Sequence, residues 1–238
     1  MQNSAQSNII EIFYSLSGEG ITVGVPTIFI RLAGCSLRCG KTDSLNMWCD
    51  TGYALSYEKG TAMTVEEVIS KTNSFSGNKI QHLITGGEPL EATKRDFVQE
   101  LANLIYEKNR GSDFELTRIE TNGKELVTGL EHMVFSIDYK LPGSGMEQEM
   151  NPENFFYIAE RKHPLDEIKF VVRNRNDFDH SLSVITRFGL ENFNLVYSPV
   201  HGELVAADLA DWIKNTGLAK SRLSLQLHKI LWGDKKGV

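Results

Sequence analysis

All three cysteines of this 238-residue chain lie within one short segment, and this crowding is the strongest constraint that the sequence provides. The segment reads Cys35-Ser36-Leu37-Arg38-Cys39, then nine residues, then Cys49. A secreted disulfide scaffold would need more cysteines, spread along the chain. A [4Fe–4S] cluster usually takes four thiolates, so three would leave one iron open for an external chelator. The crowded thiols therefore indicate a metal or redox centre.

A structural zinc site is the alternative that the spacing leaves open. Zinc in such sites takes four protein ligands. The cysteine segment contains no histidine, and the nearest one is His82, so Asp43 or Asp50 would have to complete the set. Three unrelated buried thiols would be the remaining interpretation, which the crowding disfavours.

Composition and charge favour a small-molecule ligand over nucleic acid or a membrane. The net charge is −6, whereas nonspecific nucleic-acid binding usually requires a basic balance. No apolar stretch is long enough to span a bilayer, and the polar start of the chain lacks the pattern of a secretory signal. We therefore expect a cytoplasmic protein with one domain over residues 1–238, in which residues 1–8 form a flexible tail.

Hydrophobic patterning predicts strands that alternate with helices. A capping box at Thr64-Val65-Glu66-Glu67 opens a helix through residue 71. Strands are expected at 26–32, 80–85, 114–120, 133–137, 168–172, 193–197 and 222–227, and further helices at 95–108, 178–188 and 204–215. This order predicts an α/β fold with a mostly parallel sheet, whose functional residues gather where the strands end.

Two positions stand out beyond the cysteines. Gly86-Gly87 follows an apolar strand, where missing side chains would let a ligand approach the backbone, and Glu88 could accept hydrogen bonds from an ammonium group. A simple strand-to-helix turn is the other interpretation. Arg31 interrupts an apolar strand, and its planar guanidinium suits either a ligand carboxylate or a structural salt bridge to a buried acid.

Six blocks together resemble the 7-carboxy-7-deazaguanine synthase family of radical S-adenosylmethionine enzymes. They are the segment 11–20 ending in Gly18-Glu19-Gly20, the segment 29–35 with Arg31, Trp48-Cys49-Asp50-Thr51, Thr85-Gly86-Gly87-Glu88-Pro89, Ile119-Glu120-Thr121-Asn122-Gly123 and Gln226-Leu227-His228-Lys229. The likeness runs nearly from end to end. It departs at 40–47, where an insertion of seven residues enlarges the cysteine loop, and at Ser17, where the family usually has glutamine.

The resemblance implies a reduced, partly open (β/α) barrel of the radical S-adenosylmethionine type. It also implies conversion of 6-carboxy-5,6,7,8-tetrahydropterin to 7-carboxy-7-deazaguanine with loss of ammonia, in 7-deazapurine (queuosine) biosynthesis. A [4Fe–4S] cluster, S-adenosylmethionine and Mg²⁺ would be the cofactors. A homodimer and an electron donor such as a flavodoxin or ferredoxin would be the partners.

The same resemblance implies a role for each matching residue. Cys35, Cys39 and Cys49 would hold the cluster and Thr51 the Mg²⁺. S-adenosylmethionine would be bound by Gly86, Gly87, Glu88, Glu120, Asn122, Ser136, Asp138, Lys140, Ser198, Pro199, Val200 and His201. The pterin would contact Leu16, Ser17, Gly18, Glu19, Arg31, Thr85, Gln226, His228 and Val238, with Gln226 and His228 on the last expected strand.

Less specific interpretations accompany several of these residues. Asn122-Gly123 is a strong turn signal, Thr51 could cap a turn, His201 could be a solvated loop residue, and the segment ending at Val238 could fray. Two other functions are also compatible with the cysteines. One is a radical enzyme that activates a glycyl-radical partner, and the other is a zinc-stabilised binding module without catalysis.

Overall fold

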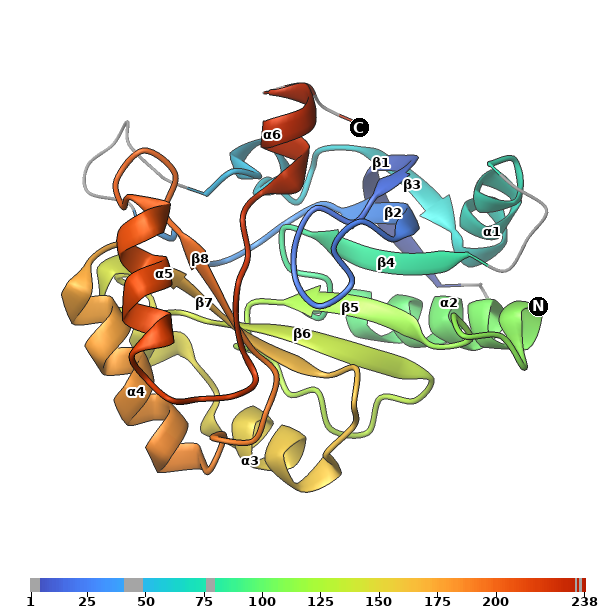
Figure 1. The fold of residues 1–238 in the computed structure, drawn as a ribbon. Coiled ribbons are helices and arrows are strands. Elements are labelled where there is room, and N and C mark those ends of the chain that lie inside the picture. The colour runs from blue at the N-terminus through green and yellow to red at the C-terminus, as the bar shows by residue number, and fades with distance from the viewer. Residues whose placement is uncertain (1–4, 41–48, 76–79, 234, 236) are drawn as a thin grey trace.

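The protein is built around one nine-stranded sheet that does not close. The computed structural model describes residues 5–40, 49–75, 80–233, 235 and 237–238, and the expected insertion at 40–47 falls, apart from Gly40, outside them. The strand order is β3-β1-β2-β4-β5-β6-β7-β8-β9 (Figure 1). The strands are β1 (Gln6–Leu16), β2 (Pro26–Leu32), β3 (Thr61–Thr64), β4 (Gln81–Gly86), β5 (Thr117–Thr121), β6 (Met133–Tyr139), β7 (Glu167–Val172), β8 (Leu195–Pro199) and β9 (Ser221–Leu223).

The pairing is parallel from β2 across to β9, whereas β1 runs antiparallel to both β2 and β3. Crossover connections therefore return the chain to the same edge, and the carboxyl ends of the parallel strands meet there. The expected α/β fold with a partly open barrel is confirmed.

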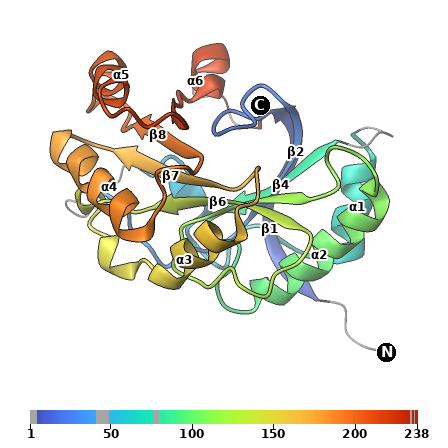
Figure 2. The same cartoon turned by 60° about the horizontal axis from the view of Figure 1, so that its bottom comes forward.

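Helices lie on both sides of this sheet (Figure 2). They are α1 (Val65–Asn73), α2 (Lys94–Asn109), α3 (Pro152–Arg161), α4 (Arg175–Phe188), α5 (Ala206–Lys214) and α6 (Leu227–Trp232). Three short 3₁₀ turns accompany them: η1 (Gly52–Ala54), η2 (Pro142–Ser144) and η3 (Glu147–Glu149). Figure 2 shows α2, α3 and α4 along one side of the sheet and α6 on the other. In the described part of the chain, no helix combines the length and apolar character needed to cross a membrane.

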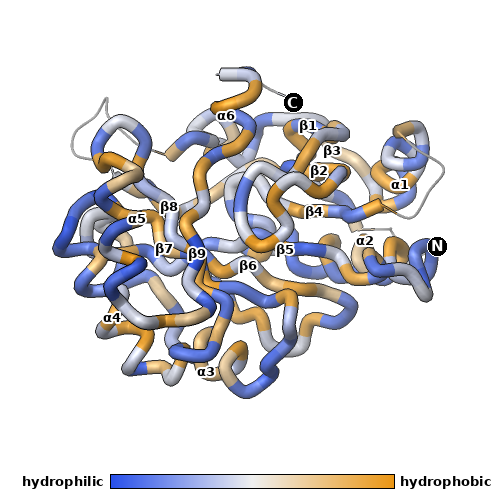
Figure 3. Tube along the Cα trace, viewed as in Figure 1, coloured by the Kyte–Doolittle hydropathy of each residue, from blue (hydrophilic) through white to orange (hydrophobic). Residues whose placement is uncertain are grey.

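The core lies between the sheet and the outer helices. Hydrophobic and hydrophilic residues both occur along the central strands (Figure 3), and the apolar side chains of Ile84, Ile119, Phe135 and Phe170 are each 0% exposed. The predicted capping box opens α1, because the Thr64 hydroxyl accepts from the Glu67 N–H at 3.3 Å and the Glu67 carboxylate accepts from the Thr64 N–H at 2.8 Å. Local capping and core burial thus act together to place this helix.

The structure corrects the sequence prediction at both ends of the chain. The tail expected at 1–8 is in fact strand from Gln6 onward, because polar residues 6–8 pair with β3 and bond their backbone there. The strand expected at 222–227 ends at Leu223. The chain then turns away when the Leu227 N–H bonds to the Gly18 carbonyl at 3.0 Å, so that Gln226 and His228 lie at the start of α6.

In the described part of the chain, two strands and two α-helices have no counterpart in the prediction. The strands are β1 and β3, and the helices are α3 and α6. The start of α3 has an ordinary signal, because the Asn151 side chain caps the Glu153 N–H at 3.1 Å and Pro152 occupies the first turn.

A buried ion pair joins the middle of the sheet to the loop after β1. Arg118 Nη2 lies 2.5 Å from Glu167 Oε1, and both side chains are 2% exposed. The other Glu167 oxygen accepts from the Ile21 N–H at 2.7 Å. A Cβ on Gly20 would lie 2.4 Å from the Glu167 carboxylate, so the backbone of the loop at Gly20 packs directly against this carboxylate. The pair therefore anchors the loop at residues 17–24.

The ends of β2 and β4 make a second close contact, between backbone and backbone. The Glu88 N–H donates to the Gly34 carbonyl at 2.8 Å, and the Gly87 N–H donates to the Leu32 carbonyl at 3.0 Å. A Cβ on Gly87 would lie 2.3 Å from the Gly34 oxygen and 2.9 Å from the Cys35 nitrogen. Only glycine lets the Gly86-Gly87 turn approach Cys35 this closely.

Arg118→Met should destabilise the fold by about 3–5 kcal/mol, because it leaves the Glu167 carboxylate buried without its cation. Urea denaturation followed by circular dichroism measures this loss. Arg175→Met is the matched control, since its pair with Asp179 has both side chains more than half exposed and should contribute below about 0.5 kcal/mol. Equal midpoints for the two variants would contradict the anchoring role.

Gly87→Ala should lower the free energy of unfolding by about 1–3 kcal/mol, because its methyl group meets backbone atoms that cannot rotate away. Gly52→Ala provides the comparison, since a Cβ there meets nothing within 4 Å. Urea denaturation measures the stability of both variants. Equal denaturation midpoints for Gly87→Ala and Gly52→Ala would show that the Gly86-Gly87 turn can accommodate a methyl group.

Candidate active site

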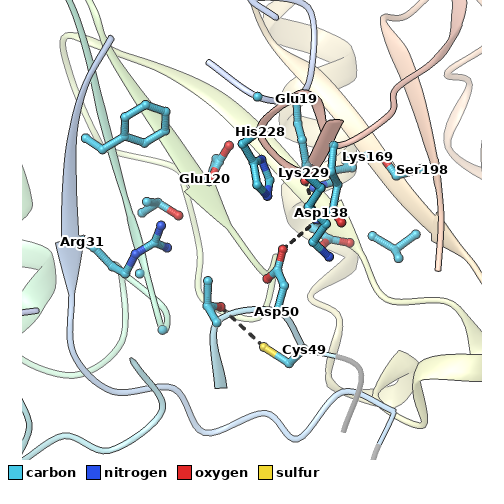
Figure 4. Close-up of a pocket in the computed structure, with 18 of the residues that line it drawn as sticks. Glu19, Arg31, Cys49, Asp50, Glu120, Asp138, Lys169, Ser198, His228 and Lys229 are labelled. Carbon is cyan, nitrogen blue, oxygen red and sulfur yellow. Dashed lines mark hydrogen bonds and ion pairs between the residues drawn. The ribbon is translucent and has the colours of Figure 1, made fainter. Parts of the chain in front are cut away.

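A cavity of about 460 Å³ opens where the parallel strands end. All predicted site residues line it except Ser17 and Glu88. In Figure 4, Arg31 lies on one side of this cavity, Lys169 and Ser198 lie on the opposite side, and Cys49 and Asp50 lie below. Residues from almost every part of the chain therefore share one space.

The three cysteines lie on the wall of this cavity. Cys35 is buried, whereas Cys39 and Cys49 are half-buried. The Asn122 side-chain amide lies 3.6 Å from the Cys35 sulfur, and the Thr51 hydroxyl lies 3.5 Å from the Cys49 sulfur. Burial raises the pKa of the Cys35 thiol to about 11, and the nearby Glu91 and Glu88 charges add to the rise.

The donor set fits a cluster with three protein thiolates. Each sulfur reaches the same cavity, and each comes from the loop that the sequence singled out. Within the described ranges, no three Cys, His, Asp or Glu side chains already converge at metal-binding distance. Thiolates are soft ligands of the kind that hold iron–sulfur clusters, so these three residues fit such a group.

Glu88 does not face the cavity, contrary to the sequence prediction. Its carboxylate is fully buried and accepts hydrogen bonds from the Thr121 hydroxyl at 2.8 Å and the Asn122 N–H at 2.6 Å. The Leu90 N–H donates to it as well, at 3.0 Å. Burial raises its pKa to about 7 although these hydrogen bonds act against the rise. The side chain therefore fastens the Gly-Gly turn to the end of β5, and only the backbone of the turn is open to a ligand.

Ser17 also lies behind the cavity wall. Its hydroxyl donates to the Glu19 carbonyl at 3.2 Å and lies 3.3 Å from the Thr22 hydroxyl, so it shapes the loop from within. Leu16, Gly18 and Glu19 of the same loop do line the cavity.

On its side of the cavity, Arg31 is held in place by Glu11 and Tyr53. Arg31 Nε lies 2.7 Å from Glu11 Oε1, and the Tyr53 hydroxyl donates to the same oxygen at 2.8 Å. The guanidinium lies over the Tyr53 ring, 5.8 Å from its centroid. The salt bridge that the sequence left open thus exists, and Arg31 nevertheless reaches the cavity.

The opposite side is organised by Lys169, which the sequence analysis missed. It forms an ion pair with Glu19. Gln226 Nε2 donates to Glu19 at 2.9 Å and to Asp50 at 2.8 Å, so α6 is fastened to both the 17–24 loop and the cysteine loop. Burial opposes ionisation of Glu19, but the Lys169 charge outweighs it and lowers the Glu19 pKa to about 2.

A signal for Lys169 exists in the sequence. It is a charge within the apolar run at 168–172, as Arg31 is within its own strand, and the rule that singled out Arg31 applies to both. His228 lies against the neighbouring loop, since a Cβ on Gly18 would be 2.6 Å from its Nδ1.

The ends of β5 and β6 supply further polar groups. Burial raises the pKa of Glu120, and the Lys169 charge acts against that rise. Lys140 Nζ lies 2.6 Å from Asp138 Oδ2. Burial opposes the Lys140 charge, but Asp138 outweighs it and raises the Lys140 pKa. The Ser136 hydroxyl is already occupied, because it donates to Glu167 at 2.6 Å.

The rim of the cavity comes from the last third of the chain. Ser198, Pro199, Val200 and His201 lie at the end of β8, where the Val200 N–H donates to the Val172 carbonyl at 2.8 Å. Thr85 and Val238 also line the cavity. The cavity lining therefore includes both Thr51, at the cysteine loop, and Val238, which are more than 150 positions apart in the sequence.

Comparisons with known proteins agree with this arrangement. No family model matches the chain. It is 50% identical to the 7-carboxy-7-deazaguanine synthase of Leptospira interrogans, covering 99% of this chain and 100% of that protein. The enzyme of the same name from Clostridium acetobutylicum is 35% identical, over 97% and 98% of the two chains.

A solved structure supports the fold independently. The crystal structure of QueE from Escherichia coli matches with a TM-score of 0.65 over 93% of this chain and 94% of that one, at 24% sequence identity. Full-length identity of this extent, on a fold of the same type, shows that the chain belongs to the 7-carboxy-7-deazaguanine synthase family.

Proposed function

We propose that the chain is a radical S-adenosylmethionine lyase that converts 6-carboxy-5,6,7,8-tetrahydropterin to 7-carboxy-7-deazaguanine with loss of ammonia, in queuosine biosynthesis. One observation carries the proposal: the three cysteines and the Gly86-Gly87 turn share a cavity with Arg31 and with the start of α6. Membership of the family favours this function over a glycyl-radical activase or a zinc-stabilised module.

Cys35, Cys39 and Cys49 would hold a [4Fe–4S] cluster, which when bound supplies one electron for the cleavage of S-adenosylmethionine. The exposed backbone of Gly86-Gly87 suits the methionyl end of that molecule, because no side chain keeps it away. Glu120, Asn122, Asp138 and Lys140 would surround its polar groups, and the 198–201 segment would contact its adenosyl end.

The pterin would lie between the Arg31 side and the Lys169 side of the cavity. Arg31 uses Nε on Glu11, so its terminal Nη groups are positioned for a substrate carboxylate. Glu19 is held ionised by Lys169 and can accept from the amino edge of the pterin. Thr85, Leu16, Gly18, Gln226, His228 and Val238 would complete the contacts.

Thr51 would bring Mg²⁺ to the substrate carboxylate, since its hydroxyl is a hard oxygen donor beside the cysteine loop. The proposal also includes a homodimer and a one-electron donor such as a flavodoxin or ferredoxin. Magnesium dependence, sedimentation and reduction by purified donors test these three parts separately from the chemistry.

Anaerobic turnover with the pterin, S-adenosylmethionine, a reductant and Mg²⁺ should yield 7-carboxy-7-deazaguanine, detected by mass spectrometry. Cys39→Ala should abolish turnover and lower the iron and sulfide content, because a cluster with two protein thiolates is labile. The Gly52→Ala variant controls for changes near the loop. Wild-type protein that binds iron and sulfide but leaves the pterin unchanged would refute the substrate and not the cluster.

Arg31→Lys should raise the KM for the pterin about tenfold or more, since lysine keeps the charge but loses the planar fork that a carboxylate accepts from. Steady-state kinetics with varied pterin measure this change, and the kcat should move less. Loss of stability with an unchanged KM would show that Arg31 serves only its pair with Glu11.

A further inference from the structure

Glu91 is a buried carboxylate with no place in the cavity or in the core packing. It follows the Gly-Gly-Glu-Pro motif by two residues and is 4% exposed. The ion pairs found among the described residues do not include it. The ammonium groups of Lys94 and Lys124 interact with it electrostatically without an ion pair, so this charge in the interior calls for an explanation.

Its oxygens are directed at the residue that follows the first cysteine. The Ser36 N–H lies 3.0 Å from Glu91 Oε2 and 3.2 Å from Oε1, and the Ser36 hydroxyl also donates to the carboxylate. The Tyr57 hydroxyl, eight residues after Cys49, donates to Oε2 at 2.5 Å. Glu91 thus ties Ser36, inside the cysteine loop, and Tyr57, beyond it, to the turn before α2.

A lysine secures the other side of the same backbone. Lys94 Nζ donates to the Ala33 carbonyl at 3.1 Å and to the Gly34 carbonyl at 2.7 Å, and it lies 5.1 Å from the centre of the Tyr57 ring. The backbone on both sides of Cys35 is therefore fixed by one carboxylate and one ammonium, which leaves little freedom to its sulfur.

The arrangement has an electrostatic consequence for anything bound to Cys35. Reduction of a bound cluster adds one electron, taken from a one-electron reductant, and a nearby fixed negative charge opposes that addition. The Ser36 N–H is also engaged by Glu91, at 3.0 Å from Oε2. Local charge is one of the factors that set the potential of such clusters. The Lys94 ammonium acts in the opposite direction to Glu91, so the contribution of Glu91 is isolated by removing its charge alone.

We propose that Glu91 is a positioning residue that holds the Cys35–Ser36 backbone and keeps the reduction potential of the bound cluster low. A low potential makes the reduced cluster a stronger electron donor. The inference rests on the proposed function for the presence of the cluster, but it concerns a residue that does not line the cavity.

The test is a redox titration of the reconstituted protein with dithionite, followed by electron paramagnetic resonance of the reduced cluster. Glu91→Gln removes the charge at nearly constant shape and should shift the midpoint potential to less negative values. Tyr57→Phe removes a donor that partly neutralises the carboxylate, and should shift the potential the opposite way. Glu91→Asp, which keeps the charge, should restore most of the wild-type value.

Glu107→Gln is the matched control, because it removes the same charge from the exposed far end of α2, where the Glu107 side chain is 64% exposed. An unchanged potential in Glu91→Gln, or one that moves only as far as in Glu107→Gln, would overturn the inference. Shifts of the same sign in Glu91→Gln and Tyr57→Phe would also overturn it, since loop geometry and not charge would then be the cause.

Two further outcomes are decided by the same measurements. If Glu91→Gln does not retain a cluster, the test depends on Tyr57→Phe. A midpoint potential of Tyr57→Phe that is more negative than that of the wild type supports the inference, and an unchanged midpoint potential overturns it. If wild-type protein itself binds no iron and sulfide, the proposed function fails and this inference falls with it, which separates that failure from a loaded protein with an unmoved potential.

Discussion

The contact between Gly34 and Gly87 is the constraint on which the site depends. The ends of β2 and β4 lie so close together that the Gly34 carbonyl accepts a hydrogen bond from the Glu88 N–H. A methyl group on Gly87 would not fit between them. This contact places the first cysteine beside the Gly-Gly turn. Because Glu88 then ties the turn to Asn122, the ends of β2, β4 and β5 become one rigid unit around Cys35.

Buried charges fix the remaining parts of the cavity wall. The Glu167 carboxylate forms an ion pair with Arg118 and accepts hydrogen bonds from the Ser136 hydroxyl and the Ile21 N–H. This one carboxylate therefore ties the loop after β1 to β5, β6 and β7. Glu19, which projects from that loop, is paired in turn with Lys169 and reached by Gln226. The order of these contacts explains how a loop near the start of the chain and a helix near its end meet at the same space.

The sequence predicted the fold class and most strands and helices. Nearly all of the site residues that it predicted line the cavity, but other lining residues, among them Glu11, Tyr53 and Lys169, were not predicted. The prediction succeeded where hydrophobic periodicity or a cysteine cluster was strong. It failed at β1 and α6, because polar strand residues are stabilised by pairing with β3, and because the turn at Leu227 depends on the Gly18 carbonyl 209 positions away. It also placed the Glu88 carboxylate in the cavity, since spacing cannot show that Thr121 and Asn122 occupy its oxygens.

Three of the cations that line the cavity form ion pairs with carboxylates of the protein, and this affects which anionic ligands can bind there. Arg31 is held by Glu11, Lys140 by Asp138 and Lys169 by Glu19, so each of these cations already has a partner. A stray anion that offers one charge must compete with a fixed carboxylate and gains little. A ligand that shares the cation in the right geometry, as a carboxylate can with the Nη groups of Arg31, keeps the existing pair and adds hydrogen bonds. At these three paired cations, selectivity therefore comes from shape and donor direction rather than from free positive charge.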